Sequence, residues 1–300
     1  NITGKFGLVS LERQLEATQA LLAQNPPIDV AVLGQFKAGK SSFLNSLLGQ
    51  NVLPVGVIPV TTAVTRLQYG EKEQIIVRHF DGTTMTAPLA DIADYTSEAK
   101  NPDNSKDVAI VDIELPFLHK YAGLRLVDTP GLGSVYKYHQ STAEDWLPEV
   151  GTALLAISAD RPLSENDLAL ISELTFHTPN IIILLTKADL LSAGQQNEVI
   201  NFFLQTLQKE INRELPIYLY STKNETARYR EVIEREILKI SANRDFEFLR
   251  ILRHKARFLV KSTLGYLDIA RNSSLQADEQ RENLQARIIT EKVNEEIMRE

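Results

Sequence analysis

Apolar residues follow two different periods along most of the chain, and together these periods predict alternating strands and helices. Short apolar runs predict strands at Asp29–Leu33, Val64–Tyr69, Ile75–Phe80, Val108–Glu114, Leu124–Val127, Ala153–Ile157, Ile181–Leu185 and Ile217–Tyr220. Helical spacing predicts helices at Leu8–Gln24, Ser41–Leu48, after the capping-box pair Ser164 and Asp167, along Val199–Ile211 and over Glu225–Ile240. We therefore expect an α/β fold with a mostly parallel central sheet flanked by helices, which binds ligands at the carboxyl ends of its strands.

The pattern changes after Asp245. Apolar residues recur there at spacings of four and seven with charges between them, and the helical pattern continues to Glu300. This predicts one or two long helices outside the sheet domain; the alternative is a terminal packing helix followed by a frayed tail. We expect one basic cluster on this segment to form the solvated face of a helix, namely Arg250, Arg253, Lys255 and Arg257.

Composition narrows the possible classes of protein. The 300 residues carry a formal net charge of −7, so no bulk positive field would attract nucleic acid or anionic lipid. The absence of cysteine fits a cytoplasmic location, and no apolar run approaches the roughly 18 residues that span a bilayer. Because the chain starts at Asn1 and stops inside a helical pattern, we expect a fragment of a longer protein.

A phosphate-binding motif follows the first predicted strand. The segment GQFKAGKS matches G-x-x-x-x-G-K-[ST], in which backbone N–H groups wrap phosphates, the lysine reaches the β/γ-phosphates and the last hydroxyl binds Mg²⁺. The helix that follows places its positive end on the anion. We expect these residues to bind nucleotide: Gly34, Gln35, Phe36, Lys37, Ala38, Gly39, Lys40, Ser41 and Ser42.

Two further segments supply candidate groups for the metal and the γ-phosphate. Asp128 closes a predicted strand in the sequence DTPG, where it can hold Mg²⁺ together with Ser41, while the N–H of Gly131 can sense the γ-phosphate. Thr61 and Thr62 lie between the two motifs, and a threonine there can bind Mg²⁺ and the γ-phosphate when a switch loop orders. The spacing to the next strand favours Thr61, but the sequence does not decide between them.

The base is predicted to be guanine. Thr186, Lys187 and Asp189 belong to the sequence TKAD after an apolar strand, and such an aspartate accepts hydrogen bonds from guanine groups that adenine lacks. Ser221, Thr222 and Lys223 follow the last predicted strand, where a further base-contacting loop is expected.

The motifs together resemble those of the dynamin superfamily of GTPases, and most closely its bacterial members. The residues that carry the resemblance are GQFKAGKSSFLNSLLG, LPVGVIPVTTAVTRLQYG, LVDTPGLGS and LLTKAD, within residues 28–240. It implies an N-terminal neck helix at residues 1–27, a GTPase (G) domain at 28–244 and a C-terminal neck segment at 245–300. It also implies GTP hydrolysis that is stimulated by G-domain dimerisation and coupled to membrane fission, fusion or tethering, with Mg²⁺ as cofactor.

The same resemblance raises a question about catalysis. Lys37 stands where some relatives carry an arginine finger and others a serine that recruits a monovalent cation. One hypothesis is that Lys37 or such a cation supplies transition-state charge. The alternative is a solvated loop lysine that only raises the local positive potential. Leu132 replaces the glutamine that orients water in Ras-like proteins. One alternative is a slow GTP-dependent switch or tether. Another is a small ribosome- or RNA-associated GTPase, which the acidic balance and the flanking helices disfavour. The expected partners are a second G domain and the inner face of a membrane, and no nucleic acid.

Overall fold

The computed structural model describes residues 9–55, 63–130 and 146–297. Contacts between residues divide the chain into two compact units, one of residues 16–255 and the other of residues 1–15 and 256–300. The first unit contains the whole sheet and all of the nucleotide-binding motifs that the structure describes.

The sheet has nine strands in the order β4-β3-β5-β2-β6-β1-β7-β8-β9. The strands are β1 (Ile28–Leu33), β2 (Val64–Tyr69), β3 (Gln74–His79), β4 (Thr84–Ala87), β5 (Val108–Leu115), β6 (Leu124–Asp128), β7 (Thr152–Ser158), β8 (Asn180–Thr186) and β9 (Ile217–Leu219). Five neighbouring pairs are parallel: β1 with β6 and β7, β2 with β5, and β8 with β7 and β9. The pairs β2–β6, β3–β4 and β3–β5 are antiparallel. The prediction of a mostly parallel sheet is confirmed.

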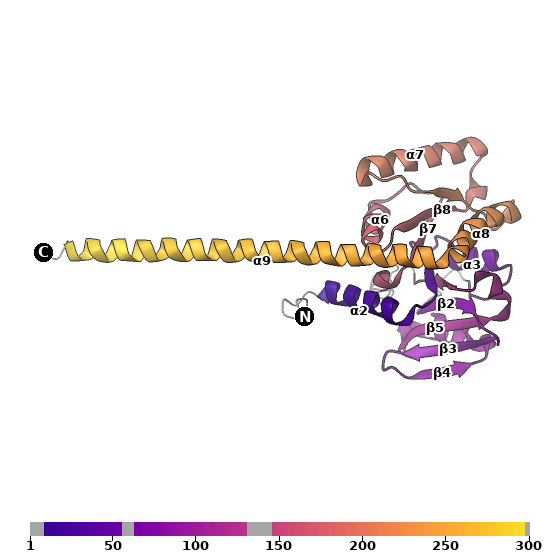
Figure 1. Ribbon diagram of the computed structural model, residues 1–300. Helices are drawn as coiled ribbons and strands as arrows, with labels where there is room; N and C mark the ends of the chain where they lie inside the picture. Colours follow the sequence, from indigo (N-terminus) through magenta and orange to yellow (C-terminus); the bar gives the residue numbers. More distant parts are fainter. Residues whose placement is uncertain (1–8, 56–62, 131–145, 298–300) are drawn as a thin grey trace. The chain divides into compact units, whose positions relative to one another are not determined.

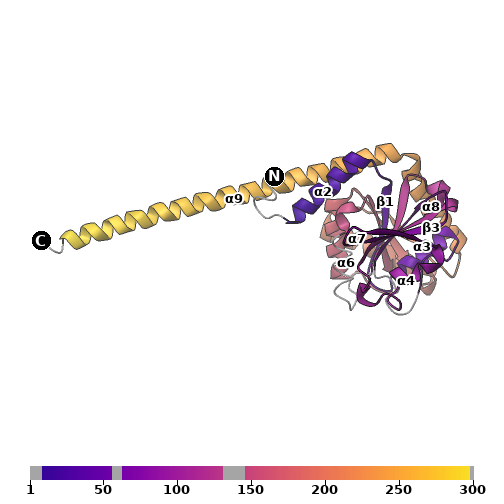
Figure 2. The ribbon, with the colours of Figure 1, turned by 90° about the horizontal axis from the view of Figure 1, so that it is seen from below.

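Helices cover both faces of the sheet (Figures 1 and 2). The helices of the sheet unit are α3 (Lys40–Leu48), α4 (Ala93–Thr96), α6 (Glu165–His177), α7 (Ala193–Ile211) and α8 (Thr226–Ala242). Two helices, α2 (Val9–Gln24) and α9 (Arg244–Ile297), contribute residues to both units. Figure 2 shows α6 and α7 on one side of the sheet and α3, α4 and α8 on the other.

Strand β1 lies at the centre of two hydrophobic cores. All six of its residues are buried, and their side chains alternate between faces as the two-residue strand period requires. Val30 and Val32 belong to the core that contains α3 and α8, whereas Ala31 and Leu33 belong to the core that contains α6 and α7. The apolar run Val30–Leu33 is typical of a strand that is buried on both faces, and this run is the pattern that predicted β1.

Parallel pairing brings the carboxyl ends of β1, β6, β7, β8 and β9 to one edge of the sheet. Strand β2 begins at the same edge, because it runs antiparallel to β6 and pairs Thr65 with Asp128. The motifs predicted to bind nucleotide are therefore neighbours in space wherever the structure describes them.

Two observations depart from the sequence predictions. Strand β4 was not expected; it is a four-residue edge strand in which only Ala87 is buried, so it lacks an apolar run. Lys255 was expected on a solvated helix face, but it is buried and its Nζ donates to the carbonyl of Pro148 at 2.6 Å. Burial lowers the pKa of Lys255 to about 7, although Asp29 and Glu149 oppose this shift. Arg250, Arg253 and Arg257 are exposed as predicted.

The second unit groups residues from both ends of the chain, 1–15 and 256–300. This grouping is what a neck built from terminal helices requires, and the neck itself stays a prediction. The helical region after Asp245 is one continuous helix, α9, rather than a short packing helix followed by a tail. Among the described residues, no helix combines the length and apolar character needed to cross a bilayer.

Candidate functional site

The phosphate-binding loop turns sharply between β1 and α3. Gly34 has a φ of +142°, and a Cβ there would lie 2.3 Å from the carbonyl oxygen of Ala156, so a side chain at this position would clash with β7. Gly39 has a φ of +89° and caps α3 at its amino end. The two glycines therefore allow the loop to cross closely over β7 and to direct the first N–H groups of α3 into the loop.

Lys40 and Ser41 connect this loop to the neighbouring strand β6. Lys40 is buried, and its Nζ donates to the carbonyls of Gly34 at 3.1 Å and Gln35 at 3.3 Å. Burial lowers the pKa of Lys40, while the negative charge of Asp128 opposes this. The Ser41 hydroxyl donates to Oδ2 of Asp128 at 2.6 Å. The loop lysine, the hydroxyl and the strand-end carboxylate thus form one cluster.

The donor set at Ser41 and Asp128 fits Mg²⁺. A hydroxyl and a carboxylate supply the hard oxygen ligands that Mg²⁺ prefers, and the ion takes only one or two protein ligands when it is bound with phosphates. The described residues contain no group of three or more His, Cys, Asp or Glu side chains that could hold a metal. Three other predicted site residues, Thr61, Thr62 and Gly131, lie outside the described residues, as does Leu132.

The TKAD segment lies beside the phosphate-binding loop. Thr186 is buried at the end of β8, and its hydroxyl lies 2.6 Å from the carbonyl of Ala38 and 3.2 Å from that of Ile157. Lys187 adopts the left-handed conformation, with a φ of 56°. Asp189 follows in a short 3-10 turn and is half-buried. This turn presents the aspartate on the same side of the sheet edge as the loop.

Ser221 fixes the orientation of Asp189. Its hydroxyl donates to Oδ1 of Asp189 at 2.6 Å and accepts from the N–H groups of Lys223 and Asn224 at 3.1 and 3.0 Å. Ser221 is buried, whereas Thr222 and Lys223 are exposed. The structure therefore brings the last predicted loop to the TKAD segment, 32 residues away in the chain.

A cavity of about 210 Å³ lies where these segments meet. Gly39 and Ser42 of the phosphate loop line it together with Thr186, Lys187 and Asp189, and Thr222 and Lys223 complete its rim. Two aromatic residues that the sequence did not indicate also line it: Tyr220 and Phe43, whose rings meet edge-to-face at 4.8 Å. The Tyr220 hydroxyl bonds to Ser46 of α3 at 2.9 Å. Such an apolar floor with a few aimed polar groups is typical of a small-molecule site.

The remaining loop residues are less enclosed. Lys37 is exposed, adopts the left-handed conformation with a φ of 64°, and holds its Nζ 5.3 Å from the centre of the Phe36 ring. Gln35 reaches the start of α6, where Ser164 and Asp167 accept hydrogen bonds from its amide. The sequence indicated Ser164 and Asp167 only as a helix cap, since nothing in their spacing suggests a partner in the phosphate loop.

Replacing Ser221 with alanine is expected to weaken guanine-nucleotide binding about tenfold to a hundredfold, because a hydrogen bond to a charged group contributes about 1.5–3 kcal/mol. GTP and GDP should lose affinity equally, since both carry the base. Calorimetric titration with each nucleotide measures this, with Thr206→Ala as a control for loss of a hydroxyl, because among the described residues the Thr206 hydroxyl bonds only to the carbonyl of Phe202 within α7. Unchanged affinity would mean that Ser221 does not act on the base-binding aspartate.

Comparison with protein families agrees with this arrangement. A family model described as the Dynamin family matches residues 30–188, which is more than half of the chain. Dynamin-like protein 2 of Campylobacter jejuni is 30% identical over 216 residues, covering 72% of this chain and 34% of that protein. An uncharacterized protein from the xynA 3′ region of a Caldicellulosiruptor strain is 28% identical over 248 residues, covering 80% of this chain and 61% of that protein. The chain thus spans less than two thirds of the length of either relative.

Solved structures share the fold. One member of an oligomerised bacterial dynamin pair, described as a mechanism for long-range sensing and tethering of membranes, superposes with a TM-score of 0.60 at 21% identity. The match covers 96% of this chain and 57% of that one. At this identity the likeness establishes the fold and no more.

Proposed function

The chain belongs to the dynamin family and is of the bacterial type, and from this premise we propose that it binds GTP and hydrolyses it to GDP and phosphate. The observation that carries the proposal is the convergence of the phosphate loop, Asp128, the TKAD segment and Ser221 on one edge of the sheet. Each group there has the chemistry that one part of a guanosine triphosphate needs.

Each part of the nucleotide is assigned to a part of the site. The N–H groups of the loop and of the start of α3 would hold the phosphate chain, together with the Lys40 ammonium. Ser41 and Asp128 would hold Mg²⁺, which when bound offsets the negative charge of the β- and γ-phosphates. Asp189, oriented by Ser221, would accept from the guanine N1–H and amino groups over the floor formed by Phe43 and Tyr220. We keep Thr61 or Thr62 and Gly131 as proposed γ-phosphate contacts.

Hydrolysis transfers the γ-phosphoryl group to water. A bond forms between the water oxygen and the γ-phosphorus while the bond from that phosphorus to the bridging oxygen breaks. GDP leaves with the electron pair, and the attacking water releases a proton to solvent. Catalysis of this step consists mainly of positioning and charge stabilisation, so cations near the leaving oxygen count most. Lys40 is such a cation. We propose Lys37 as a second, acting once a partner encloses it, because it is exposed in the isolated chain.

Replacing Lys37 with alanine is expected to lower the maximal rate of GTP hydrolysis about tenfold to a hundredfold, because one positioned charge at a phosphoryl transition state contributes about 1.4–2.7 kcal/mol or more. Affinity for GDP should change little. Rates are measured at saturating GTP in potassium and in choline buffers, which separates the lysine from a monovalent cation. An unchanged maximal rate in both buffers removes Lys37 from the mechanism.

We further propose that hydrolysis is stimulated when two G domains pair, and that the cycle remodels or tethers a membrane from its cytoplasmic face. Kinship supports this: the related pair of bacterial dynamins is described as tethering membranes. The proposed division into neck (1–27 and 245–300) and G domain (28–244) would connect the nucleotide cycle to the rest of such a protein.

The test is GTP turnover measured against enzyme concentration, with and without liposomes. Activity per molecule should rise with concentration, because the pair is the active form, while Lys40→Ala should stay inactive throughout. Turnover that is slow and strictly proportional to enzyme concentration would instead favour a GTP-dependent switch or tether without significant hydrolysis. Salt-sensitive binding of RNA would favour a ribosome-associated GTPase.

A further inference from the structure

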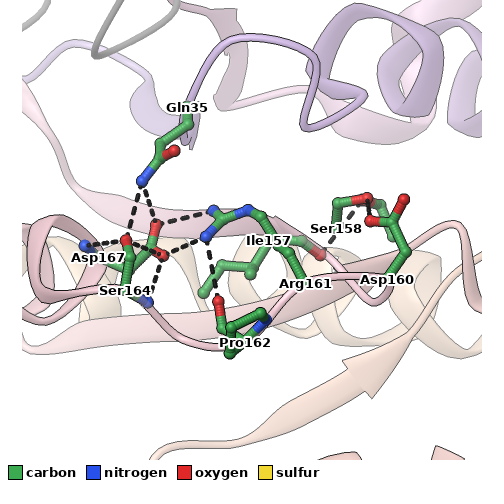
Figure 3. Close-up of polar contacts among 9 residues, drawn as sticks. Gln35, Ile157, Ser158, Asp160, Arg161, Pro162, Ser164 and Asp167 are labelled. Atoms are coloured by element: carbon green, nitrogen blue, oxygen red, sulfur yellow. Dashed lines mark hydrogen bonds and ion pairs between the residues drawn. The ribbon is translucent and has the colours of Figure 1, made fainter.

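A buried carboxylate at the start of α6 accepts hydrogen bonds from three residues in two parts of the chain (Figure 3). Asp167 is 1% exposed and accepts from Arg161 at 2.6 and 3.0 Å, from the N–H and hydroxyl of Ser164 at 3.0 and 2.6 Å, and from the Gln35 amide at 3.3 Å. The Gln35 amide also donates to the Ser164 hydroxyl at 3.0 Å. Burial would raise the pKa of Asp167, but its bonds to Arg161 and Ser164 lower it overall.

This cluster contains more than the capping of α6 requires. Helix α7 begins with the same reciprocal capping box, in which Ser192 and the neutral Gln195 satisfy each other's backbone N–H groups. That box lies on an exposed turn and has no arginine. At α6 the cap instead contains the buried carboxylate of Asp167, which accepts two hydrogen bonds from Arg161 and one from the Gln35 amide of the phosphate loop. Helix capping therefore does not account for the contacts of Arg161 and Gln35.

Gln35 connects this cluster to the loop lysine. Its side-chain amide donates to Ser164 and Asp167, while its backbone carbonyl accepts from Lys40 Nζ at 3.3 Å. A continuous path therefore leads from Asp167 through Gln35 to the ammonium group proposed to hold the phosphates. Arg161 matters to this path because it offsets the charge of a carboxylate that would otherwise repel a phosphate anion nearby.

We propose that Asp167 is a positioning residue for the phosphate-binding loop: held by Arg161 and Ser164, it fixes Gln35 and through it the loop around Lys40. The proposal rests on the nucleotide-binding function proposed above and adds a role for residues beyond its motifs. Asp167 does not touch the nucleotide in this account. It sets the geometry in which the loop meets the phosphates, and α6 supplies the rigid support.

A double-mutant cycle tests the proposal. Wild type, Gln35→Ala, Asp167→Ala and the double variant are titrated with GDP and Mg²⁺ by calorimetry, and their thermal unfolding midpoints are measured. Each single variant should weaken GDP binding about tenfold, and the double variant should also lose only about tenfold, because both changes cut one connection. Ser192→Ala, which removes a cap without touching the loop, should leave GDP affinity unchanged, whereas Ser164→Ala should weaken it about threefold.

Other outcomes overturn the proposal. A roughly hundredfold loss in the double variant would mean that the two residues act independently, and unchanged binding in Asp167→Ala would reduce the cluster to a helix cap. If Asp167→Ala does not fold, Ser164→Ala replaces it in the cycle: a loss of about tenfold in the double variant then supports the proposal, and a loss of about thirtyfold overturns it. If wild type binds GDP but the losses of affinity in the two single variants add in the double variant, only the positioning role is refuted. Wild type that does not bind GDP refutes the proposed function, and this inference with it.

Discussion

Replacing Lys40 with alanine is expected to reduce affinity for GTP by about 30-fold to 5,000-fold, because truncating one partner of a buried charge pair costs about 2–5 kcal/mol. Lys40 is buried where the loop closes, and its neighbours Gly34 and Gln35 offer it only carbonyl oxygens. Burial makes the free ammonium costly, as its lowered pKa reflects, so a phosphate anion gains more from it than from an exposed lysine.

Equilibrium binding of GTP with Mg²⁺ measures this loss, and Lys72→Ala provides the control. Lys72 is exposed in the turn between β2 and β3, so the control removes the same charge from the protein without altering the site. If Lys40→Ala folds as wild type does and binds GTP within about threefold of it, the assignment of the phosphate loop is wrong.

Replacing Asp189 with asparagine is expected to shift preference from GTP to XTP by about 1,000-fold or more, because sites built on specific hydrogen bonds discriminate strongly. The carboxylate accepts from two guanine donors. Xanthine keeps N1–H but has a carbonyl in place of the guanine amino group, so the oxygen and the NH₂ of an asparagine amide can pair with both. With guanine, the asparagine NH₂ would instead face the guanine amino group, and two donors cannot pair. Ser221 holds Oδ1 of Asp189 at 2.6 Å, so the replacement should keep its position.

Competition between GTP and XTP for the variant gives the ratio directly, and Asp81→Asn on the exposed β3–β4 turn controls for the change in charge. Since an asparagine amide could turn to present either atom, the ratio of the two affinities is more informative than either alone. Selectivity for GTP that survives the replacement would show that another loop reads the base.

The fold and the motif positions could be predicted because strong local signals coincide with buried elements. The phosphate loop follows β1, which is buried throughout and ends in the apolar run Val30–Leu33, and TKAD follows the apolar run Ile181–Leu185 of β8. Strand β4 was not predicted because it has no such run. It is an edge strand of sequence TMTA, in which only Ala87 is buried. Local pattern locates elements that are buried and misses those that pair mainly through the backbone.

Contacts between distant residues could not be predicted in the same way. Lys255 sits in a basic stretch that is typical of a solvated helix face, yet it is enclosed near Asp29 and Glu149 and bonds to Pro148, 107 residues away. The Gln35–Asp167 contact joins residues 132 apart. The capping box at Ser164 was predicted and is confirmed, but its second role depends on tertiary packing that spacing does not encode.

The central claim is that one pocket holds a triphosphate, its magnesium and a guanine. Calorimetric titration of the folded wild-type chain with GTP in the presence of Mg²⁺ tests it most directly. The prediction is saturable binding of one GTP per chain, which ATP does not compete away and which weakens when EDTA removes the metal. Folded protein that takes up no GTP to saturation, or that binds ATP equally well, would contradict the account.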